Sequence, residues 1–169
     1  MDQKKFHFAF GVYGIIAVSN KILVIRKNKG PYINRYDLPG GSLNEGEPLR
    51  HAFSREIKEE TGLEVLNAKQ LGTVSFRYPW QYQQYTWNEH VGVFYHVDEY
   101  SGVPLTDVKQ FAGQDSLGAI WADIESLNLE NSSPLVLKAK EFILLKKFIT
   151  TDTKYDHWNV LSKSQHESF

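Results

Sequence analysis

The sequence predicts an α/β fold in which helices pack on a mixed β-sheet. The first observation is a series of segments rich in β-branched and aromatic residues, separated by turn residues. The second is a pair of segments in which apolar residues recur at helical spacing. The third is the composition: 41% of the 169 residues are hydrophobic and 23% are charged, near the average for a globular domain. A single domain is therefore expected.

The predicted strands begin near the N-terminus. Residues 8–18 favour β-structure, Ser19-Asn20 supplies turn residues, and residues 21–26 resume the pattern, which predicts a β-hairpin. Further strands are predicted at residues 71–78, 90–97 and 119–122. Between the hairpin and these strands, Pro39 and the glycines after it predict either a loop in which the backbone approaches a ligand closely or simply a tight turn.

Two segments carry helical signals. The first helix is predicted over Pro48 to Thr61, because proline suits the first turn and Gly62 supplies a stop. The second begins at Pro134 and directs its apolar side toward the sheet. Its lysines are expected to face water: Lys138, Lys140 and Lys146. The domain is assigned to residues 1–150, and the polar tail 151–169 contains no signal that decides whether it docks.

The composition excludes several classes of protein. The net charge is −1 and the basic residues are scattered, so a nucleic-acid polymer is not an expected partner. No apolar run approaches the roughly 20 residues that span a bilayer, and the N-terminus lacks the apolar core of a signal peptide, so a cytoplasmic protein without membrane contact is expected. Cysteine is absent, so a metal would be held by oxygen or imidazole.

Three carboxylates share one face of the first helix. At about 100° per residue, Glu56, Glu59 and Glu60 fall within an arc of about 100°, which we place opposite the apolar stripe. A solvated surface is the simpler interpretation of such a face. However, like charges at these spacings cost about 0.2 to 0.5 kcal/mol per pair, and a divalent cation would compensate them.

The residues around these glutamates form a longer pattern. Gly41 is followed by five residues, Glu47, seven residues, and then Arg55-Glu56-Ile57, Lys58, Glu59-Glu60, Thr61 and Gly62-Leu63. Fixed Gly, Glu or Arg positions at about 7% frequency each, with two apolar ones, would match by chance with a probability on the order of 10⁻⁷ to 10⁻⁶. The segment from Gly41 to Leu63 resembles the complete Nudix box of the MutT-like Nudix hydrolases. The preceding strands, Leu38-Pro39-Gly40 and the later Trp121 extend the resemblance to most of the chain.

The resemblance implies a Nudix fold, an α/β/α sandwich with a central mixed β-sheet, and a hydrolase that splits a phosphoanhydride with Mg²⁺, for which Mn²⁺ could substitute. Glu59 and Glu60 correspond to the principal metal ligands. Glu56 corresponds to a glutamate that serves as a ligand or as the base that activates water. The Gly40 carbonyl corresponds to a backbone ligand.

Other site residues follow from the same resemblance. Arg55, which we count with the catalytic residues, and Glu47 correspond to an orienting salt bridge, for which a bidentate guanidinium is well suited. Some members add a carboxylate from a later loop. Asp115 stands in that relation to Trp121, and Asp107 is the second candidate.

The substrate is less constrained. The aromatic stretch after residue 76 contains candidates that would stack a base and meet phosphates, although aromatics that cover the core are an equal alternative. These candidates are Arg77, Trp80 and Tyr82. Nucleoside triphosphates, ADP-ribose and nucleotide sugars all remain open as small-molecule substrates. The histidines show no metal-ligand spacing and are assigned no role.

Two other classes compete with the hydrolase. A Nudix module that senses a nucleotide without cleaving it is expected to lack box glutamates, and none is missing here. A phosphatase of another type, or an isomerase on the same scaffold, would be distinguished by its products. The resemblance to the family leaves the oligomeric state open between a monomer and a homodimer.

Overall fold

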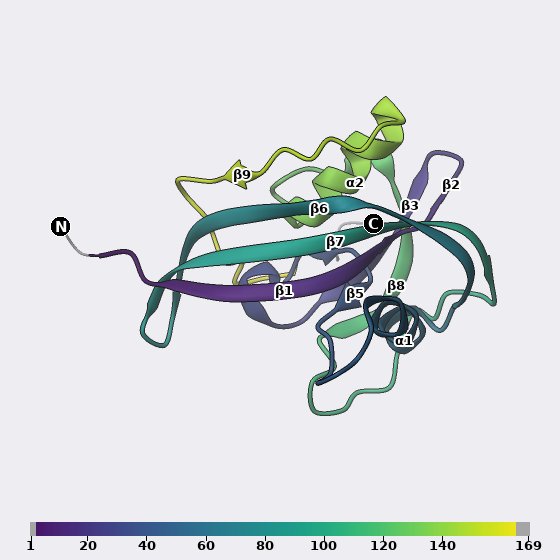
Figure 1. Cartoon of the computed structure of the whole chain (residues 1–169), viewed down its shortest axis with the longest axis horizontal. Coiled ribbons are helices and arrows are strands. Elements are labelled where there is room, and N and C mark those ends of the chain that lie inside the picture. The colour runs from purple at the N-terminus through teal and green to yellow at the C-terminus, as the bar shows by residue number, and fades with distance from the viewer. Residues whose placement is uncertain (1–2, 165–169) are drawn as a thin grey trace.

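The computed structural model describes residues 3–164. Helix α1 (Leu49–Thr61) and helix α2 (Pro134–Leu145) lie on opposite sides of a long twisted sheet, as Figure 1 shows. This arrangement confirms the predicted α/β sandwich. Within the described residues, no helix is both long enough and apolar enough to cross a membrane.

The larger sheet is mixed, as predicted, and has the strand order β5-β1-β7-β6-β9. Its members are β1 (Phe6–Ile15), β5 (Gly40–Gly41), β6 (Glu64–Tyr82), β7 (Tyr85–Ser101) and β9 (Thr153–Lys154). Strand β1 runs parallel to β7 and β9 runs parallel to β6, whereas the other pairs are antiparallel. The predicted central strands are the buried parts of β6 and β7, which continue into a hairpin whose turn contains Gln83 at φ 52°.

The smaller sheet is built around β3 (Lys21–Lys27). This strand pairs antiparallel with β2 (Ala17–Val18), β4 (Tyr36–Asp37) and β8 (Ser116–Asp123). The predicted N-terminal hairpin is therefore wrong for most of its first arm, because only β2 pairs with β3. Strand β1 instead lies inside the larger sheet, where its C-terminal half is covered on both faces.

The core has two layers because alternate residues of a strand point to opposite faces. In β3, Ile22 and Val24 join the cluster under α2, whereas Leu23 and Ile25 join the cluster under α1. The same alternation divides β1 and β7. Each helix therefore seals one apolar layer, and the two layers share the strands between them.

Short helices and the second α-helix complete the described chain. The 3₁₀ helices η1 (Gly30–Tyr32) and η2 (Ile124–Ser126) follow β3 and β8. In α2, the expectation that Lys138 faces water is wrong, since this residue is 7% exposed. Its ammonium group donates to Glu141 at 2.7 Å and to the Ile149 carbonyl at 3.0 Å, which satisfies the buried charge.

The described part of the tail docks on the domain. Strand β9 pairs with β6 at Phe76 and Arg77. Further along, the Trp158 ring packs against the core cluster under α2, and its indole N–H donates to the Pro31 carbonyl at 2.9 Å. The tail therefore adds a strand and an aromatic anchor to the sandwich.

Candidate active site

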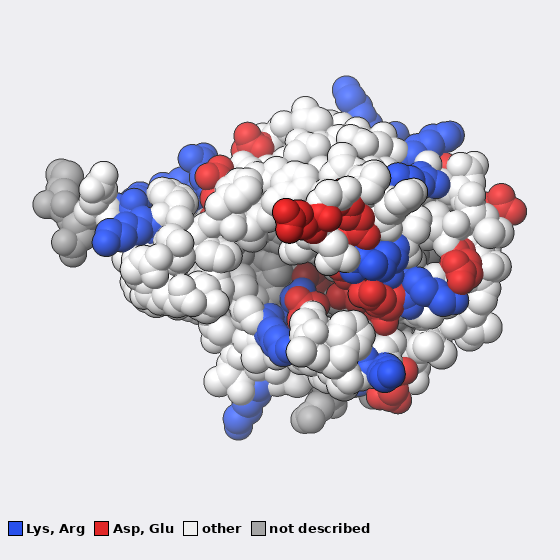
Figure 2. Space-filling view, turned by 60° about the horizontal axis from the view of Figure 1, so that its bottom comes forward, with Lys and Arg blue, Asp and Glu red and all other residues white. Residues whose placement is uncertain are grey.

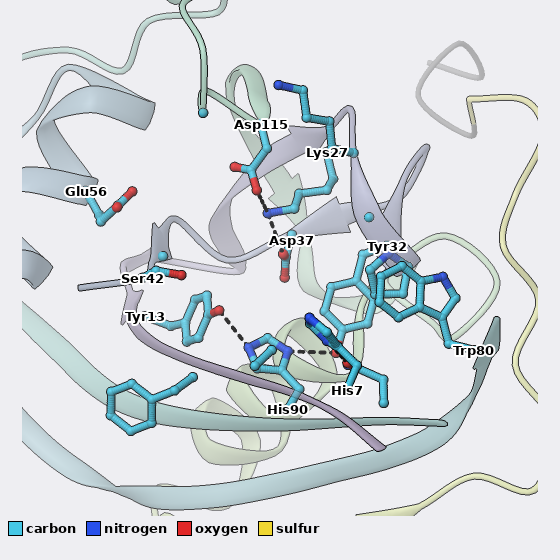
Figure 3. A pocket seen from close by; sticks show the side chains of 18 residues that line it. His7, Tyr13, Lys27, Tyr32, Asp37, Ser42, Glu56, Trp80, His90 and Asp115 are labelled. Atoms are coloured by element: carbon cyan, nitrogen blue, oxygen red, sulfur yellow. Dashed lines mark hydrogen bonds and ion pairs between the residues drawn. The ribbon is translucent and has the colours of Figure 1, made fainter. Parts of the chain in front are cut away.

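A cavity of about 290 Å³ opens between the larger sheet, η1, the N-terminal part of the box and the loop before β8. Figure 2 shows a hollow on one face of the molecule with acidic and basic side chains around it. The acidic end of the cavity is formed by Lys27, Asp37, Glu56 and Asp115. The aromatic end is formed by His7, Tyr32, Trp80, Asn88 and His90. In Figure 3, Glu56 and Trp80 lie on opposite sides of the cavity.

Two glycines of the box set the geometry of the acidic end. Helix α1 ends at Thr61, and the next residue, Gly62, adopts φ 79° and donates its N–H to the Lys58 carbonyl. At Gly41, a side-chain Cβ would lie 2.8 Å from the Glu56 carboxyl carbon. A side chain at this position would therefore displace the Glu56 carboxylate, and glycine lets the strand approach that carboxylate closely.

Arg55 organises the carboxylates of the box. Its Nε and Nη2 donate to the two Glu47 oxygens at 2.8 and 2.9 Å, which is the bidentate pair expected from the sequence. Its Nη1 donates to Glu56 at 2.8 Å and to Glu59 at 3.2 Å. The hydrogen bonds from Arg55 lower the pKa of Glu47 to about 2. One guanidinium thus holds three carboxylates of a single loop and helix.

The glutamates of α1 do not lie opposite the apolar stripe, and that expectation is wrong. Glu60 is 1% exposed and accepts the Gly40 N–H at 2.8 Å. At about 100° per residue, Ile57 lies only about 60° around the helix from Glu60, so the glutamate turns toward the interior. Burial raises the pKa of Glu60 well above its usual range, and it also raises the pKa of Glu56.

Lys27 supplies a cation to the acidic end. Its Nζ lies 2.5 Å from Asp115 and 3.7 Å from Asp37. Dashed lines in Figure 3 mark these two ion pairs. Burial alone would lower the pKa of Lys27, but attraction to the two aspartates outweighs it and raises that pKa. Of the two later aspartates, Asp115 lines the cavity, whereas Asp107 is 93% exposed and pairs with Arg26 at 3.6 Å.

The donor set of the acidic end fits a hard divalent cation. Glu56, Glu60 and Asp115 offer carboxylate oxygens. After the larger effect of burial, repulsion by Asp115 raises the pKa of both glutamates, and repulsion by Glu56 raises the pKa of Glu60. Among residues 3–164, no three acidic or histidine side chains are arranged as a group that could hold a metal ion. Two of the box glutamates, Glu56 and Glu59, are instead paired with Arg55. Gly40 contacts the set through its N–H to Glu60.

His90 lies at the centre of the aromatic end, between two tyrosine hydroxyl groups. Its Nε2 is 2.7 Å from the Tyr13 hydroxyl, and its Nδ1 is 2.9 Å from the Tyr32 hydroxyl. Burial lowers the pKa of His90 to about 3. A neutral imidazole has one donor and one acceptor nitrogen, so one tyrosine receives a hydrogen bond from the ring and the other donates one. The ring orientation is thereby fixed.

A second polar chain runs beside it. His7 Nδ1 lies 2.7 Å from Asn88 Oδ1, and the Asn88 amide donates to the Tyr78 hydroxyl at 2.8 Å. The parallel register of β1 and β7 places His7 directly opposite Asn88. Sequence reasoning missed His7 and His90, because their partners lie on strands and a 3₁₀ helix distant in the sequence, which no local pattern indicates.

The aromatic residues predicted to bind substrate separate in the structure. Trp80 lines the cavity, and Tyr82 stacks on it with ring centroids 4.7 Å apart. Arg77 is exposed and does not line the cavity. It alternates with Phe76 and Tyr78, which are buried under α2, so its side chain lies on the other face of the sheet.

Comparison with known proteins identifies relatives that are similar in sequence to part of this chain. An ADP-ribose pyrophosphatase of Methanocaldococcus jannaschii is 47% identical over 66 residues, an alignment that covers 37% of this chain and only 39% of that relative. An 8-oxo-dGTP diphosphatase of Proteus vulgaris is 32% identical over 80 residues, or 47% of this chain and 70% of the relative.

The fold and the family profile agree with these relatives. The crystal structure of a MutT Nudix hydrolase from Burkholderia pseudomallei matches with a TM-score of 0.64 at 24% identity, and the match covers 80% of this chain and 97% of that one. The NUDIX domain profile matches residues 5–145, which include both helices and the acidic end of the cavity. Because one profile spans most of the chain and its box carries the Arg55 network, this protein belongs to the Nudix family.

Proposed function

We propose that the protein is a divalent-metal-dependent pyrophosphohydrolase that cleaves a phosphoanhydride in a nucleoside diphosphate-linked substrate. One observation carries the proposal: a single cavity joins the acidic end to the aromatic end. Its volume, about 290 Å³, lies just below the range of about 300 to 1,000 Å³ for small-molecule sites. An anionic diphosphate and an aromatic base would thus meet complementary surfaces in one site.

The side chains of the acidic end divide the chemical work. Lys27 presents an ammonium group to phosphate oxygens, and Arg55 orients the glutamates. Bound Mg²⁺ or Mn²⁺, held by Glu56, Glu59, Glu60 and also the Gly40 carbonyl or Asp115, would neutralise phosphate charge and position the attacking water.

The reaction is a hydrolysis. A water oxygen attacks one phosphorus, the bridging P–O bond breaks, and the leaving phosphate takes the bonding electron pair. The proton of the water passes to a carboxylate, for which Glu56 is the candidate. Burial raises the pKa of Glu56, which makes the ionised group a better base. The hydrogen bond from Arg55 keeps this carboxylate beside the cavity.

The aromatic end would hold the nucleoside. Trp80 offers an indole face for stacking, and His7 and Asn88 provide polar groups at the edge of the cavity. The named relatives point to two substrate classes, 8-oxo-dGTP and ADP-ribose. Both contain a purine nucleoside whose sugar carries at least two phosphates joined by an anhydride, so both belong in the first test.

Hydrolysis is favoured over nucleotide sensing without cleavage. A module that only binds has no need for the complete set of box glutamates, and Glu56, Glu59 and Glu60 are all present. The bidentate bond from Arg55 to Glu47 also holds the loop of the box against its helix.

A substrate panel tests the proposal. The purified protein is incubated with 8-oxo-dGTP, dGTP, ADP-ribose and nucleotide sugars in Mg²⁺, Mn²⁺ or chelator, and the products are identified by mass. We expect metal-dependent release of a nucleoside monophosphate together with pyrophosphate or a sugar phosphate. Binding of these nucleotides without any cleavage would reject the hydrolase and support the sensing module.

A further inference from the structure

We propose that Trp158 is a positioning residue of the substrate pocket and that the tail segment 151–161 holds one wall of the aromatic end in place. The wall is formed by Lys29, Gly30, Pro31 and Tyr32, which line the cavity. The tail begins beyond residue 145, where the match to the family profile ends. The proposal rests on the proposed function, because it gives this wall a part in substrate binding.

The tail bonds to the residues that follow the wall as well as to the wall itself. The Trp158 indole N–H donates to the Pro31 carbonyl at 2.9 Å. The Asn34 side-chain amide donates to the Leu161 carbonyl at 2.6 Å, and Arg35 Nη1 donates to the Asn159 carbonyl at 2.7 Å. Three tail residues are thus hydrogen-bonded to the segment 31–35, which connects the wall to β4.

The other side of the tail is fixed to the sheet. The Tyr155 N–H donates to the Arg77 carbonyl at 2.8 Å, and the Asp152 carboxylate accepts the Ser75 N–H at 2.8 Å. These bonds lie on β6, the strand that carries Trp80 into the cavity. The tail therefore links two sides of the aromatic end, the η1 wall and the β6 strand.

The Trp158 ring occupies the space between these two sides. Its centroid is 4.9 Å from the Tyr78 ring and 5.7 Å from the Tyr32 ring, which it meets edge-on. The Arg35 guanidinium lies over its face at 4.4 Å. Tyr32 in turn reaches His90 at 2.9 Å, on the floor of the cavity. A direct series of contacts thus runs from the tail to the pocket.

The acidic end has separate support. Its glutamates are held by Arg55 within the box, and Lys27 is held by Asp115 and Asp37. None of these groups bonds to the tail in the described structure. Loss of Trp158 should therefore weaken the binding of the nucleoside portion and leave the bond-breaking step and the metal requirement unchanged.

Two substitutions remove the contacts of Trp158 to different extents. Trp158→Phe keeps an aromatic ring over Tyr78 and Arg35 but removes the bond to Pro31, whereas Trp158→Ala removes both. His157→Ala changes an exposed neighbour and serves as the matched control. For each variant, kcat, KM and the Mg²⁺ concentration for half activity are measured with 8-oxo-dGTP and with ADP-ribose.

For the better substrate we expect KM to rise about 3-fold in Trp158→Phe and about 10-fold or more in Trp158→Ala, from the loss of a hydrogen bond and then of packing. The value of kcat should stay within about 2-fold, and the Mg²⁺ dependence should not shift. His157→Ala should match the wild type. An unchanged KM in Trp158→Phe and Trp158→Ala, or a fall in kcat alone, would overturn the proposal.

The two proposals fail in different ways. If the wild type cleaves neither substrate, the proposed hydrolase is rejected. Calorimetry then measures the affinity of each variant for 8-oxo-dGMP and AMP, which tests the role of the wall in binding without turnover. Weaker nucleotide binding by Trp158→Phe than by His157→Ala would still support the positioning role. Equal binding by these two variants would reject it. Trp158→Phe decides the question if Trp158→Ala does not fold.

Discussion

The two ends of the cavity are built in opposite ways. The acidic end is a network of charges. Arg55 contacts Glu47, Glu56 and Glu59 within one loop and helix, and beside it Lys27 pairs with Asp37 and Asp115. The aromatic end is a network of neutral groups, in which His90 lies between two tyrosines contributed by other elements.

The proposed bond-breaking step belongs to the acidic end and the proposed recognition of the nucleoside belongs to the aromatic end. Charged side chains at helical spacing can be placed by a short segment, because each turn of α1 returns to the same face. Buried neutral groups need partners on every side, since an unpaired polar atom costs about 1 to 3 kcal/mol. The aromatic end therefore depends on the whole fold, and changes there should affect binding and stability more than the bond-breaking step.

The largest expected effect is at the acidic end. Glu59→Gln and Glu60→Gln should each reduce kcat by about 100-fold or more, because an amide is a weaker ligand for a divalent cation than a carboxylate. Initial rates with the best substrate of the panel, at saturating Mg²⁺, measure the loss. Glu64→Gln, an exposed residue paired with Lys58, is the control and should retain activity. Near-normal turnover in both box variants would show that these glutamates are not ligands of the catalytic metal.

The next effect is on stability and concerns His90. Its folded pKa of about 3 lies below the ordinary value of 6.5, so the unfolded chain takes up the proton first as the pH falls. The stabilising contribution is complete above pH 6.5 and is lost progressively as the pH falls toward 3. Between pH 7 and pH 4.5, this histidine should lower the free energy of unfolding by about 2 to 3 kcal/mol.

Urea unfolding of the wild type and of His90→Gln at several pH values isolates this contribution. Glutamine retains a donor and an acceptor but binds no proton in this range. The wild type should therefore lose more stability than the variant as the pH falls. Parallel pH profiles for the two proteins would show that His90 is not the buried neutral group described here.

A smaller effect is expected at Trp80. Trp80→Ala should raise KM about 10-fold with little change in kcat, because stacking of a base on an aromatic ring contributes about 1 to 3 kcal/mol. Trp87→Ala offers a matched control, since Trp87 belongs to the same hairpin and does not line the cavity. Steady-state kinetics with 8-oxo-dGTP and ADP-ribose compare the two. Equal KM values in these two variants would show that the base does not stack on Trp80.

The smallest effect is expected at Arg77. Arg77→Ala should leave KM and kcat within about 2-fold of the wild type, because the side chain lies on the face of the sheet away from the cavity. The same kinetic assay checks this result. A rise in KM similar to that of Trp80→Ala would restore Arg77 as a phosphate-binding residue.

The sequence predicted much of the fold and the position of the reactive residues. Helix α1 was placed to within a residue, and the centres of β6, β7 and β8 were located. The N-terminal hairpin was predicted wrongly, because the β-favouring run contains both β1 and β2, which separate into different sheets. Local preference identifies strands, but the choice of partner depends on burial of both faces, which is a property of the whole sheet.

The sequence by itself determined the Arg55 network of the box, because Gly41, Glu47, Arg55 and the glutamates stand at spacings that one loop and one helix convert into a cluster. Only the tertiary structure brought Lys27, Asp37 and Asp115 to the acidic end, and it alone decided the aromatic end. His7 meets Asn88 through the parallel pairing of β1 with β7, and Trp158 reaches Pro31 across more than half of the chain. Such contacts depend on the packing of distant segments, for which the order of residues along the chain carries no local spacing rule.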